Sequence, residues 1–474
     1  MRIILKNFRI VDEEIDTLGT VIVQDGIIDE ILSAEQPIDN KAAGMVIDGS
    51  ALSSSGQSVV RKRSVVLMPA FVDLHAHFRD PGIHDKNVLA PSELSLPSEV
   101  IESASLAAAA GGFGTVVCMA NTKPVTDTIE KAAAIKNRSD VLGLIDLYPV
   151  LSLTKGMEGK ELSEITRLSK KDIPLMISED GKDLADDDLF LAAMFEAKRI
   201  DIPVSCHCDL GGDENMAVRR AIELGKKAGC HIHIAHVSTR EAIETIRSAK
   251  ASVKIAAKAD AKTDCFTLTC EVTPHHLYLT TEDSRRLGEK TWGAVNPPLR
   301  SEEDRLALVH ALIDGTIDAI ATDHAPHSRA DKESGAPGFS GFETAFAAVN
   351  TIHSKTDFSG AASTASLAAF DLKRLSCLMS ANPASLLGFD GGSKNCEQDQ
   401  GLKRGRILPG YRADLVLIDT EAPWNVEPGS FKSRGKNSPL EGCKLFGKIM
   451  MTFHGGRLVY YSPCLLFPVY YSHQ

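Results

Sequence analysis

The chain has 474 residues, of which 43% are hydrophobic and 24% charged, and its formal net charge is −11. This composition is that of an ordinary globular protein with enough apolar material for a large core. A net negative charge repels phosphate backbones, so we expect no nucleic-acid partner. Ten cysteines scattered over this length are too few for a disulfide framework, which favours reduced thiols and a cytoplasmic location.

We expect neither a targeting segment nor a membrane span. The apolar run within Met1–Lys6 is too short for a signal peptide, and the apolar tail Leu465–Tyr471 is far too short to cross a bilayer. The tail is expected to pack on the body of the protein or on another subunit. The sequence therefore leaves open whether the protein forms a homodimer.

Strands are predicted near the N-terminus at 3–10 and 20–32, and Asp25-Gly26 between two apolar runs indicates a hairpin turn. A polar, Ser-rich stretch follows and is interpreted as a loop. From Val65 onward, apolar strands alternate with helical stretches such as 99–110 and 217–227. These strands are predicted at 65–74, 113–120, 144–152, 173–178, 202–207, 231–237, 268–274 and 317–322.

Eight strands separated by helices predict an α/β fold, and specifically a (β/α)8 TIM barrel. An open, doubly wound sheet would show the same alternation. Strands return after about residue 400, at 413–418, 448–453 and 457–460. We therefore predict a small β-sandwich domain built from residues 1–64 and 403–474, beside a barrel of residues 65–402.

Histidine and aspartate residues stand at the ends of five predicted barrel strands. His75 and His77 follow the first strand, and residues i and i+2 of an extended segment share one face. The fourth, fifth, sixth and eighth strands end in Asp180, His207, His236 and Asp323. A closed barrel gathers these strand ends round one mouth, where barrel enzymes have their active sites, whereas an open sheet spreads them along a line. The pattern therefore favours the barrel and predicts a metal site.

Four imidazoles and two carboxylates suit borderline divalent metals, with Zn²⁺ first by ligand type. Six ligands are too many for one tetrahedral ion, so we predict two ions that share a bridging carboxylate and a hydroxide. One ion is assigned His75, His77 and Asp323, the other His207 and His236, and Asp180 is assigned as the bridge.

Other residues that could bind metal receive a structural interpretation. Cys206 and Cys208 alternate around His207 on a strand, so they point away from its face and are expected to pack in the core. His233 is out of phase with His236 and is interpreted as a packed or exposed structural residue.

Several segments resemble, in order, the motifs of dihydroorotases. Asp73-Leu74-His75-Ala76-His77-Phe78-Arg79-Asp80-Pro81-Gly82 is similar to the family signature D-x-H-x-H-x-R-x-P-G, and Ala321-Thr322-Asp323-His324-Ala325-Pro326-His327 is similar to the second signature. Further matches are Cys118-Met119-Ala120-Asn121-Thr122, Ser178-Glu179-Asp180-Gly181, His236-Val237-Ser238-Thr239, Thr273-Pro274-His275-His276, Asn296-Pro297-Pro298-Leu299-Arg300, Asn382-Pro383-Ala384 and Lys436-Asn437-Ser438-Pro439. The resemblance covers nearly the whole chain.

The resemblance implies a binuclear zinc barrel of the amidohydrolase superfamily. It implies the third step of de novo pyrimidine synthesis, in which N-carbamoyl-L-aspartate cyclises reversibly to L-dihydroorotate with loss of water. Asp323 is then the catalytic general acid and base. In this branch an aspartate, here Asp180, often replaces the carboxylated lysine that bridges the metals in other members. Association with other enzymes of the pathway is a further possibility that the resemblance leaves open.

Such a substrate carries a second carboxylate that does not react. Arg79 lies one alternate step beyond His77 and can hold that carboxylate with its two-pronged guanidinium. Asn121, at the end of the second strand, and His327, after Asp323, are further candidate contacts. Asn296 is a candidate for the pyrimidine ring. Loop capping is the alternative explanation for Asn121 and Asn296. The segment 273–276 is expected to position the ring or a loop, without binding metal.

Two segments, Lys86–Pro97 and Lys258–Phe266, depart from the family pattern as insertions. Two alternative functions stay open: another cyclic amidohydrolase, such as allantoinase or dihydropyrimidinase, and a non-catalytic homologue that acts as a binding partner. Arg79 with Asn121 favours a carboxylate-bearing ring, and Asp180 disfavours the members with a bridging lysine. The presence of all six predicted ligands disfavours the non-catalytic homologue.

Overall fold

The computed structural model describes residues 1–38, 43–50, 64–80, 98–172, 174–181, 183–209, 211–259, 266–354, 371–391, 402–463 and 470–471. The first predicted insertion, most of the second and most of the apolar tail lie outside these residues.

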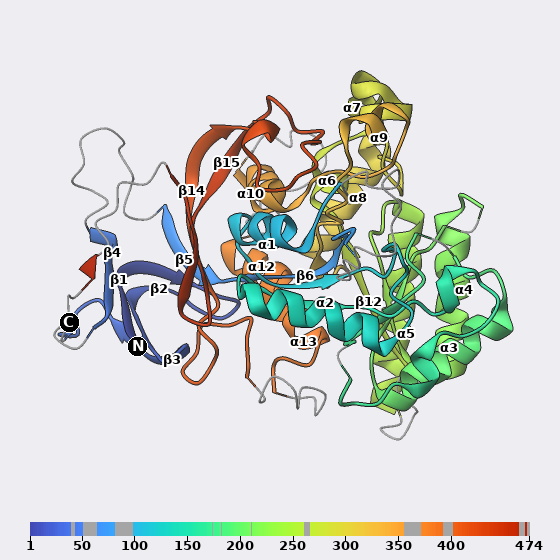
Figure 1. The fold of residues 1–474 in the computed structure, drawn as a ribbon, viewed down its shortest axis with the longest axis horizontal. Helices are drawn as coiled ribbons and strands as arrows, with labels where there is room; N and C mark the ends of the chain where they lie inside the picture. Colours follow the sequence, from blue (N-terminus) through green and yellow to red (C-terminus); the bar gives the residue numbers. More distant parts are fainter. Residues whose placement is uncertain are drawn as a thin grey trace, which may run out of the picture.

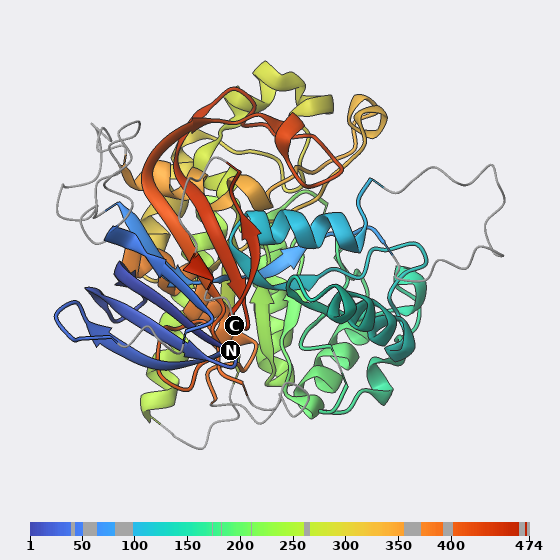
Figure 2. The ribbon, with the colours of Figure 1, turned by 60° about the vertical axis from the view of Figure 1, so that its left-hand side comes forward.

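A ring of parallel strands forms the centre of the larger part of the molecule, and helices pack round it (Figures 1 and 2). Its strands are β6 (Phe71–Ala76), β7 (Phe113–Cys118), β8 (Asp146–Pro149), β9 (Ile177–Ser178), β10 (Val204–Cys206), β11 (His231–Ile234), β12 (Thr267–Val272) and β13 (Ala319–Ile320). Hydrogen bonds join them in the orders β6-β7-β8 and β13-β12-β11-β10-β9. Parallel bridges from Leu151 to Ile177 and from Ala76 to His324 connect the two groups at both seams. The strands therefore close into the predicted barrel.

The longer helices follow barrel strands and cover the outside of the ring. They are α1 (Ile101–Ala110), α2 (Ile129–Leu142), α3 (Asp187–Ile200), α4 (Glu214–Ala228), α5 (Arg240–Ala259), α8 (Glu302–Ile313) and α10 (Ala345–Ser354). Shorter ones are α6 (Pro274–Tyr278), α7 (Thr281–Leu287), α9 (Arg329–Glu333), α12 (Leu372–Ser376) and α13 (Asn382–Leu386). Helix α4 shows the local signals: the Asp213 side chain accepts from Met216 N at its start, and Gly229 ends it at φ 65°. Within the described ranges, no helix has both the length and the apolar character that crossing a bilayer requires.

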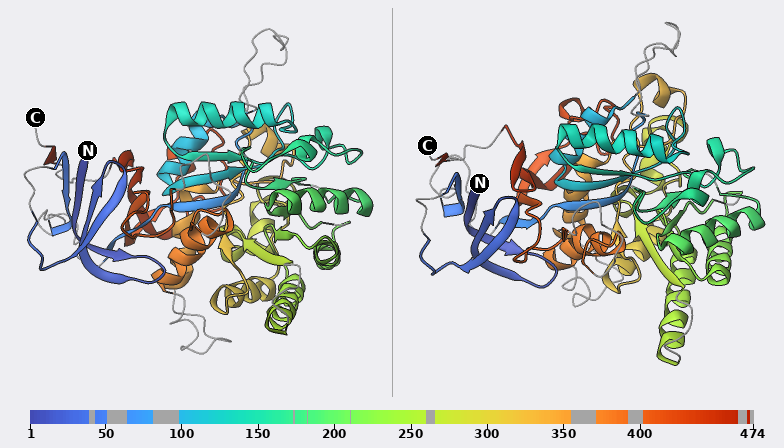
Figure 3. Two further views of the ribbon diagram at one scale, coloured as in Figure 1. Left: turned by 90° about the horizontal axis from the view of Figure 1, so that it is seen from below. Right: turned by 60° about the horizontal axis from the view of Figure 1, so that its bottom comes forward.

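Both ends of the chain contribute strands to a separate β domain (Figure 3). These strands are β1 (Arg2–Val11), β2 (Asp16–Gln24), β3 (Ile27–Ser33), β4 (Met45–Asp48), β5 (Val65–Pro69), β14 (Leu415–Asn425), β15 (Lys444–His454), β16 (Arg457–Tyr461) and β17 (Tyr470–Tyr471). They form one sheet in the order β16-β15-β14-β5-β1-β2-β3, with β4 on β1 and β17 on β4. The predicted hairpin at Asp25-Gly26 is confirmed, because Gln24 pairs with Ile27 and both turn residues have positive φ.

The prediction of one barrel strand over 65–74 is wrong, because this stretch forms two strands. Only β6 belongs to the ring, whereas β5 pairs with β1 and β14 of the β domain. Val65 and Leu67 on β5 face the core of the β domain, and Val66 and Met68 face the core of the barrel. A strand buried on both faces shows no alternation of polar residues, so its apolar run is indistinguishable from that of an inner barrel strand.

Phe113 on β7 tests how much the core depends on aromatic packing. It is fully buried, and its ring centroid lies 5.5 Å from that of Phe71 and 5.3 Å from that of Phe342. We expect Phe113→Ala to lower the free energy of unfolding by about 3–5 kcal/mol, because it removes these contacts and leaves a cavity. The control Phe195→Ala, at a side chain 49% exposed on α3, should change it by only about 0.5 kcal/mol. Urea denaturation measures both, and equal losses would contradict this packing.

Candidate active site

The six predicted metal ligands converge at the carboxyl ends of the barrel strands. All six are buried, with relative exposures between 1% for His75 and 6% for His77. The ring centroid of His75 lies 5.3 Å from that of His77, 4.8 Å from that of His207 and 5.2 Å from that of His236. Residues from β6, β9, β10, β11 and β13 thus meet at one point, although 248 residues separate the first from the last along the chain (323 − 75).

The neighbours of His77 indicate where its proton resides. Its Nδ1 lies 2.9 Å from Asn121 Oδ1, and an amide oxygen can only accept. Nδ1 therefore carries the proton, and Nε2 turns a lone pair toward Asp323 Oδ1 at 3.0 Å. Two acceptors at this distance repel each other unless positive charge lies between them.

His75 presents the same arrangement. Its Nδ1 lies 2.9 Å from Glu271 Oε1, so Nδ1 donates. Its Nε2 then faces Asp180 Oδ1 at 3.7 Å and Asp323 Oδ1 at 3.6 Å, with no hydrogen bond of its own. Burial lowers the pKa of His75, but the neighbouring carboxylates of Asp180 and Glu271 outweigh it and raise this pKa well above its ordinary value. The surroundings of Nε2 therefore stabilise a cation.

His207 and His236 complete the group on the β10 and β11 side. His236 Nε2 lies 3.0 Å from His207 Nδ1, and His207 Nε2 lies 3.4 Å from Asp180 Oδ1. Burial lowers the pKa of both imidazoles, which keeps them neutral, the form that binds metals.

The spacing of these atoms fits a metal cluster. Two ligand atoms about 2.1 Å from one tetrahedral zinc ion lie about 3.4 Å from each other. The contacts described above between atoms of the predicted ligands range from 3.0 to 3.7 Å. Asp180 Oδ2, His75 Nε2, His207 Nε2 and His236 Nδ1 are buried without a hydrogen-bond partner among the described residues. Unpaired buried polar atoms are costly, so this donor set is suited to hold cations.

The grouping of donor atoms places His75 between two sets. Donor atoms of His75, His77 and Asp180 lie within 4.8 Å of one another, and so do those of His75, His207 and His236. Asp180 lies within 3.7 Å of His75, His77 and His207, which is the central position predicted for the bridge.

Three residues of the site have left-handed backbone conformations. The φ angles are 58° for Arg79, 32° for His236 and 45° for Asp323. Such conformations cost about 1–3 kcal/mol each outside glycine, and they concentrate where function requires a side chain to be re-aimed. The direction of these three side chains is therefore set by the turn at each strand end and not by the alternation of side chains along the strand.

The predicted substrate residues form a second group next to the cluster. Arg79 Nη2 lies 3.3 Å from His327 Nε2, which also contacts Pro337 O at 2.7 Å. Arg79 Nε is buried without a hydrogen-bond partner in the described structure. The Oδ1 of Asn121 contacts His77, so the NH2 group of Asn121 is the part that can donate to a carboxylate. Asn296 is exposed, and within the described residues no hydrogen bond joins it to this group.

The sequence profile of the amidohydrolase family matches residues 66–459. Dihydroorotase from Clostridium botulinum (strain Eklund 17B / Type B) is 34% identical over 470 residues, which cover 97% of this chain and 100% of that protein. Dihydroorotase from Bacillus licheniformis is 35% identical over 440 residues, which cover 87% and 91%. The chain belongs to the dihydroorotase branch of the amidohydrolase family.

Solved structures of other amidohydrolases share the fold. L-hydantoinase (dihydropyrimidinase) from Arthrobacter aurescens aligns with a TM-score of 0.75 at 23% identity, covering 98% of this chain and 97% of the other. Dihydropyrimidinase from Brevibacillus agri NCHU1002 aligns with a TM-score of 0.73 at 18% identity, covering 98% and 96%. At such identities the likeness shows the fold alone.

Sequence reasoning on this amidohydrolase missed Glu271, the buried carboxylate behind His75. Glu271 Oε2 lies 3.0 Å from His233 Nε2, and His233 Nδ1 lies 2.8 Å from Thr269 Oγ1. The structural interpretation of His233 is confirmed: it is fully buried and orients the glutamate that orients His75. A charged residue inside the apolar run 267–272 was the available signal, because a buried carboxylate needs partners.

Asp73 was also missed, although it opens the first signature. Its carboxylate accepts from Thr322 N at 2.9 Å and from His75 N at 3.2 Å. It thereby ties β6, which precedes His75, to the end of β13, which precedes Asp323. Burial raises the pKa of Asp73 to about 7, against the effect of these hydrogen bonds.

Asp146, Asp414 and His454 form another group with metal-ligand chemistry, at the amino end of β8. Arg404 and Arg412 both donate to Asp146 Oδ2. Although burial opposes ionisation, these two guanidinium groups hold the pKa of Asp146 well below its usual range. The positive charge here comes from arginines, so we interpret the group as an ion cluster between barrel and β domain.

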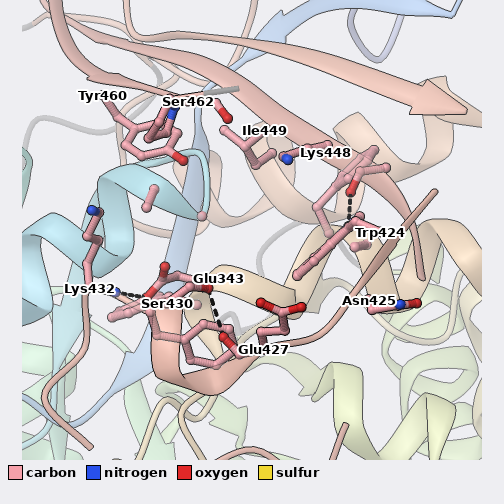
Figure 4. Close-up of a pocket in the computed structure, with 18 residues that line it drawn as sticks. Glu343, Trp424, Asn425, Glu427, Ser430, Lys432, Lys448, Ile449, Tyr460 and Ser462 are labelled. Carbon is pink, nitrogen blue, oxygen red and sulfur yellow. Dashed lines mark hydrogen bonds between the residues drawn. The ribbon is translucent and has the colours of Figure 1, made fainter. Parts of the chain in front are cut away.

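A pocket of about 440 Å³ lies apart from the metal-ligand group, between α1, the start of α10 and strands β14–β16 (Figure 4). Trp424 and Tyr460 give it aromatic walls, and Trp424 Nε1 donates to Gly447 O at 2.9 Å. Glu343 accepts from Lys432 N at 2.6 Å, and burial raises its pKa to about 7. None of the predicted site residues lines this pocket.

The contact between Glu271 and His75 predicts a role in metal affinity. Carboxylates that orient a ligand histidine typically contribute 10–100-fold to metal binding. We expect Glu271→Gln to weaken metal binding by about this factor, because the amide cannot accept from both histidines as a carboxylate does. The control Glu223→Gln, at an exposed residue of α4, should leave it unchanged. Competition with a chromogenic chelator measures both, and equal affinities would contradict the role of Glu271.

Proposed function

We propose that this chain is a zinc-dependent dihydroorotase, which interconverts N-carbamoyl-L-aspartate and L-dihydroorotate in the third step of pyrimidine synthesis. The observation that carries the proposal is the half-buried Arg79 side chain beside the candidate metal ligands, whose buried Nε has no hydrogen-bond partner among the described residues and whose Nη2 contacts His327. A half-buried cation there suits a cyclic substrate that carries a carboxylate outside the reacting amide. The curated relatives named dihydroorotase over nearly the whole chain support the same assignment.

In the proposed complex, Arg79, the NH2 group of Asn121 and His327 hold the substrate carboxylate that does not react. Burial lowers the pKa of Arg79, yet a guanidinium stays charged at neutral pH. Its unpaired Nε and its Nη2 can bind one carboxylate as a fork. Asn296, on the exposed loop beside the mouth, is the proposed contact for the ring.

We propose two zinc ions, held by His75, His77, His207, His236 and Asp323 and bridged by Asp180. When bound, they would make a hydroxide nucleophile accessible near neutral pH and polarise the carbonyl oxygen under attack. The buried unpartnered atoms and the 3.0–3.7 Å spacing of the donors support this assignment.

Asp323 is the proposed general acid and base. Although burial opposes ionisation, the neighbouring imidazoles of His77 and His75 hold the pKa of Asp323 well below its usual range, so it is ionised and can accept a proton. In hydrolysis it accepts the proton of the nucleophile and passes it to the ring nitrogen as the C–N bond breaks. In synthesis it removes the proton from the ureido nitrogen that attacks the carboxyl carbon, and it passes this proton to the carboxyl oxygen that departs as water when the C–O bond breaks.

Two observations separate this proposal from a hydantoinase or dihydropyrimidinase function. The residue proposed as the bridge is Asp180, and in the described structure its ion-pair contacts are with histidines and not with a lysine. The site also holds Arg79, for which a ring without a carboxylate offers no partner.

We propose further that the enzyme acts in the cytoplasm, as a homodimer or together with other enzymes of pyrimidine synthesis. The seven cysteines in the described residues are free thiols, which supports this location.

Turnover of purified protein tests the proposal directly. We expect loss of the ultraviolet absorbance of L-dihydroorotate, and no comparable turnover of allantoin, dihydrouracil or hydantoin. Turnover of one of these three without turnover of L-dihydroorotate would overturn the assignment.

Asp323→Asn removes the group that carries the proton while keeping its size. We expect kcat to fall by at least about 10²–10⁴-fold, the usual contribution of general acid–base catalysis. Circular dichroism should show an unchanged fold, and Asp314→Asn, at a partly exposed residue after α8, should keep full activity. Substantial activity in Asp323→Asn would refute its role in proton transfer.

Arg79→Lys keeps the charge and replaces the fork with a point charge. We expect KM for L-dihydroorotate to rise about tenfold or more with a smaller change in kcat, because one donor group replaces two. Steady-state kinetics measure the split. An unchanged KM would remove Arg79 from the substrate site.

A further inference from the structure

A second imidazole pair lies at the end of β12, between the strands that carry His236 and Asp323. Thr273 ends this strand, and the short helix α6 that follows begins with Pro274, His275 and His276. Both histidines are buried, with exposures of 5% and 2%. Their ring centroids are only 4.7 Å apart, yet their hydrogen bonds differ completely.

His276 has a fully satisfied, structural environment. Its Nε2 lies 3.1 Å from Pro297 O, so this nitrogen donates, and its Nδ1 lies 2.8 Å from Thr273 Oγ1. The Thr273 hydroxyl also accepts from His276 N at 3.1 Å. These contacts hold the backbone next to Asn296, the proposed ring contact.

His275 has no such environment. Its Nε2 is buried and lacks a hydrogen-bond partner among the described residues. Burial lowers its pKa to about 4, Asp323 acts in the opposite direction, and His236 and His75 lower it further. The imidazole therefore lies within electrostatic range of three candidate metal ligands, and it is neutral near pH 7.

The other side of His275 faces the loop after β13. Its ring meets the edge of Phe339 at 5.4 Å and 82°, and Phe339 O accepts from Ala325 N at 2.7 Å. Phe339 thus belongs to the loop that carries His327. His275 therefore contacts the loop that carries the proposed substrate residue His327 and also lies within electrostatic range of the metal-ligand group.

A metal-ligand role does not account for His275. His275 belongs to neither of the groups at the barrel mouth whose donor atoms lie within 4.8 Å of one another. Asp323 also lies outside these groups, but it lies 3.0 Å from His77 and 3.6 Å from His75, whereas no such contact joins His275 to a predicted ligand among the described residues. A buried imidazole nitrogen without a partner is unfavourable in the free protein, so a ligand that pairs with it explains its position.

We infer that His275 is a further substrate-contacting residue, whose Nε2 hydrogen-bonds to a neutral polar group of the substrate, the ureido carbonyl or a ring N–H. A neutral imidazole suits such a group and not the carboxylate, which Arg79 holds. This inference rests on the proposed function. In this proposal, His275 at the end of the seventh strand helps to recognise the ring, with which the proposed metal ligands and Arg79 make no specific contact.

Three variants test the inference with L-dihydroorotate. His275→Phe keeps the ring shape and removes the polar atoms, and we expect kcat/KM to fall about tenfold, a typical loss for one hydrogen bond. His275→Gln places an amide near the position of Nε2 and should recover part of that loss. His276→Gln is the neighbouring control and should lower the melting temperature, because it disturbs the contact with Pro297.

The inference also predicts what should not change. The metal content of His275→Phe should equal that of the wild type, and its melting temperature should be equal or higher, because an unpaired polar atom leaves the core. A structural role would instead lower the melting temperature and spare kcat/KM.

Each contrary result has a distinct meaning. Wild-type turnover with an unchanged kcat/KM in His275→Phe, or no recovery in His275→Gln, overturns the role of His275 alone. Loss of metal in His275→Phe also overturns it, in favour of a metal ligand. A wild type that does not turn over L-dihydroorotate overturns the proposed function and the role of His275 with it.

Discussion

Lone pairs of buried histidines and carboxylates face one another at the mouth of the barrel, and only positive charge between them makes this arrangement stable. Asn121 and Glu271 each accept from the Nδ1 of a histidine, which forces the Nε2 lone pairs of His77 and His75 toward Asp323 and its neighbours. The raised pKa of His75 has the same cause. The surrounding carboxylates favour a positive charge at Nε2, and a proton supplies this charge when no metal ion does.

The fold serves this arrangement by placing the ligands on strand ends and holding them from behind. Asp73 ties the first barrel strand to the eighth, and the chain from Thr269 through His233 to Glu271 fixes His75 from the seventh. Arg79, on the turn after the first strand, aims a second positive group at the same space. One half of the site is therefore suited to cations and the other half to an anion, which matches the proposed substrate with its reacting amide and inert carboxylate.

The sequence predicts well that these six residues converge, because parallel strands of a barrel must end at one mouth and the periodicity of two fixes which residues share a face. Partners across the barrel are harder to predict. Glu271 and Asp73 follow no local pattern, and their contacts depend on which strands become neighbours. The apolar stretch 65–74 contains no signal for its division, since β5 and β6 are both buried on two faces. His275 illustrates a further limit, because its importance lies in a hydrogen bond that the chain itself does not make.

Anomalous diffraction at the zinc absorption edge, from crystals grown with zinc, tests the central claim most directly. Two peaks about 3.5–4 Å apart among His75, His77, Asp180, His207, His236 and Asp323 are predicted, as in other two-metal sites. A single peak would contradict the bridging role of Asp180. Zinc bound only at Asp146, Asp414 and His454, or nowhere in the barrel mouth, would contradict the whole account.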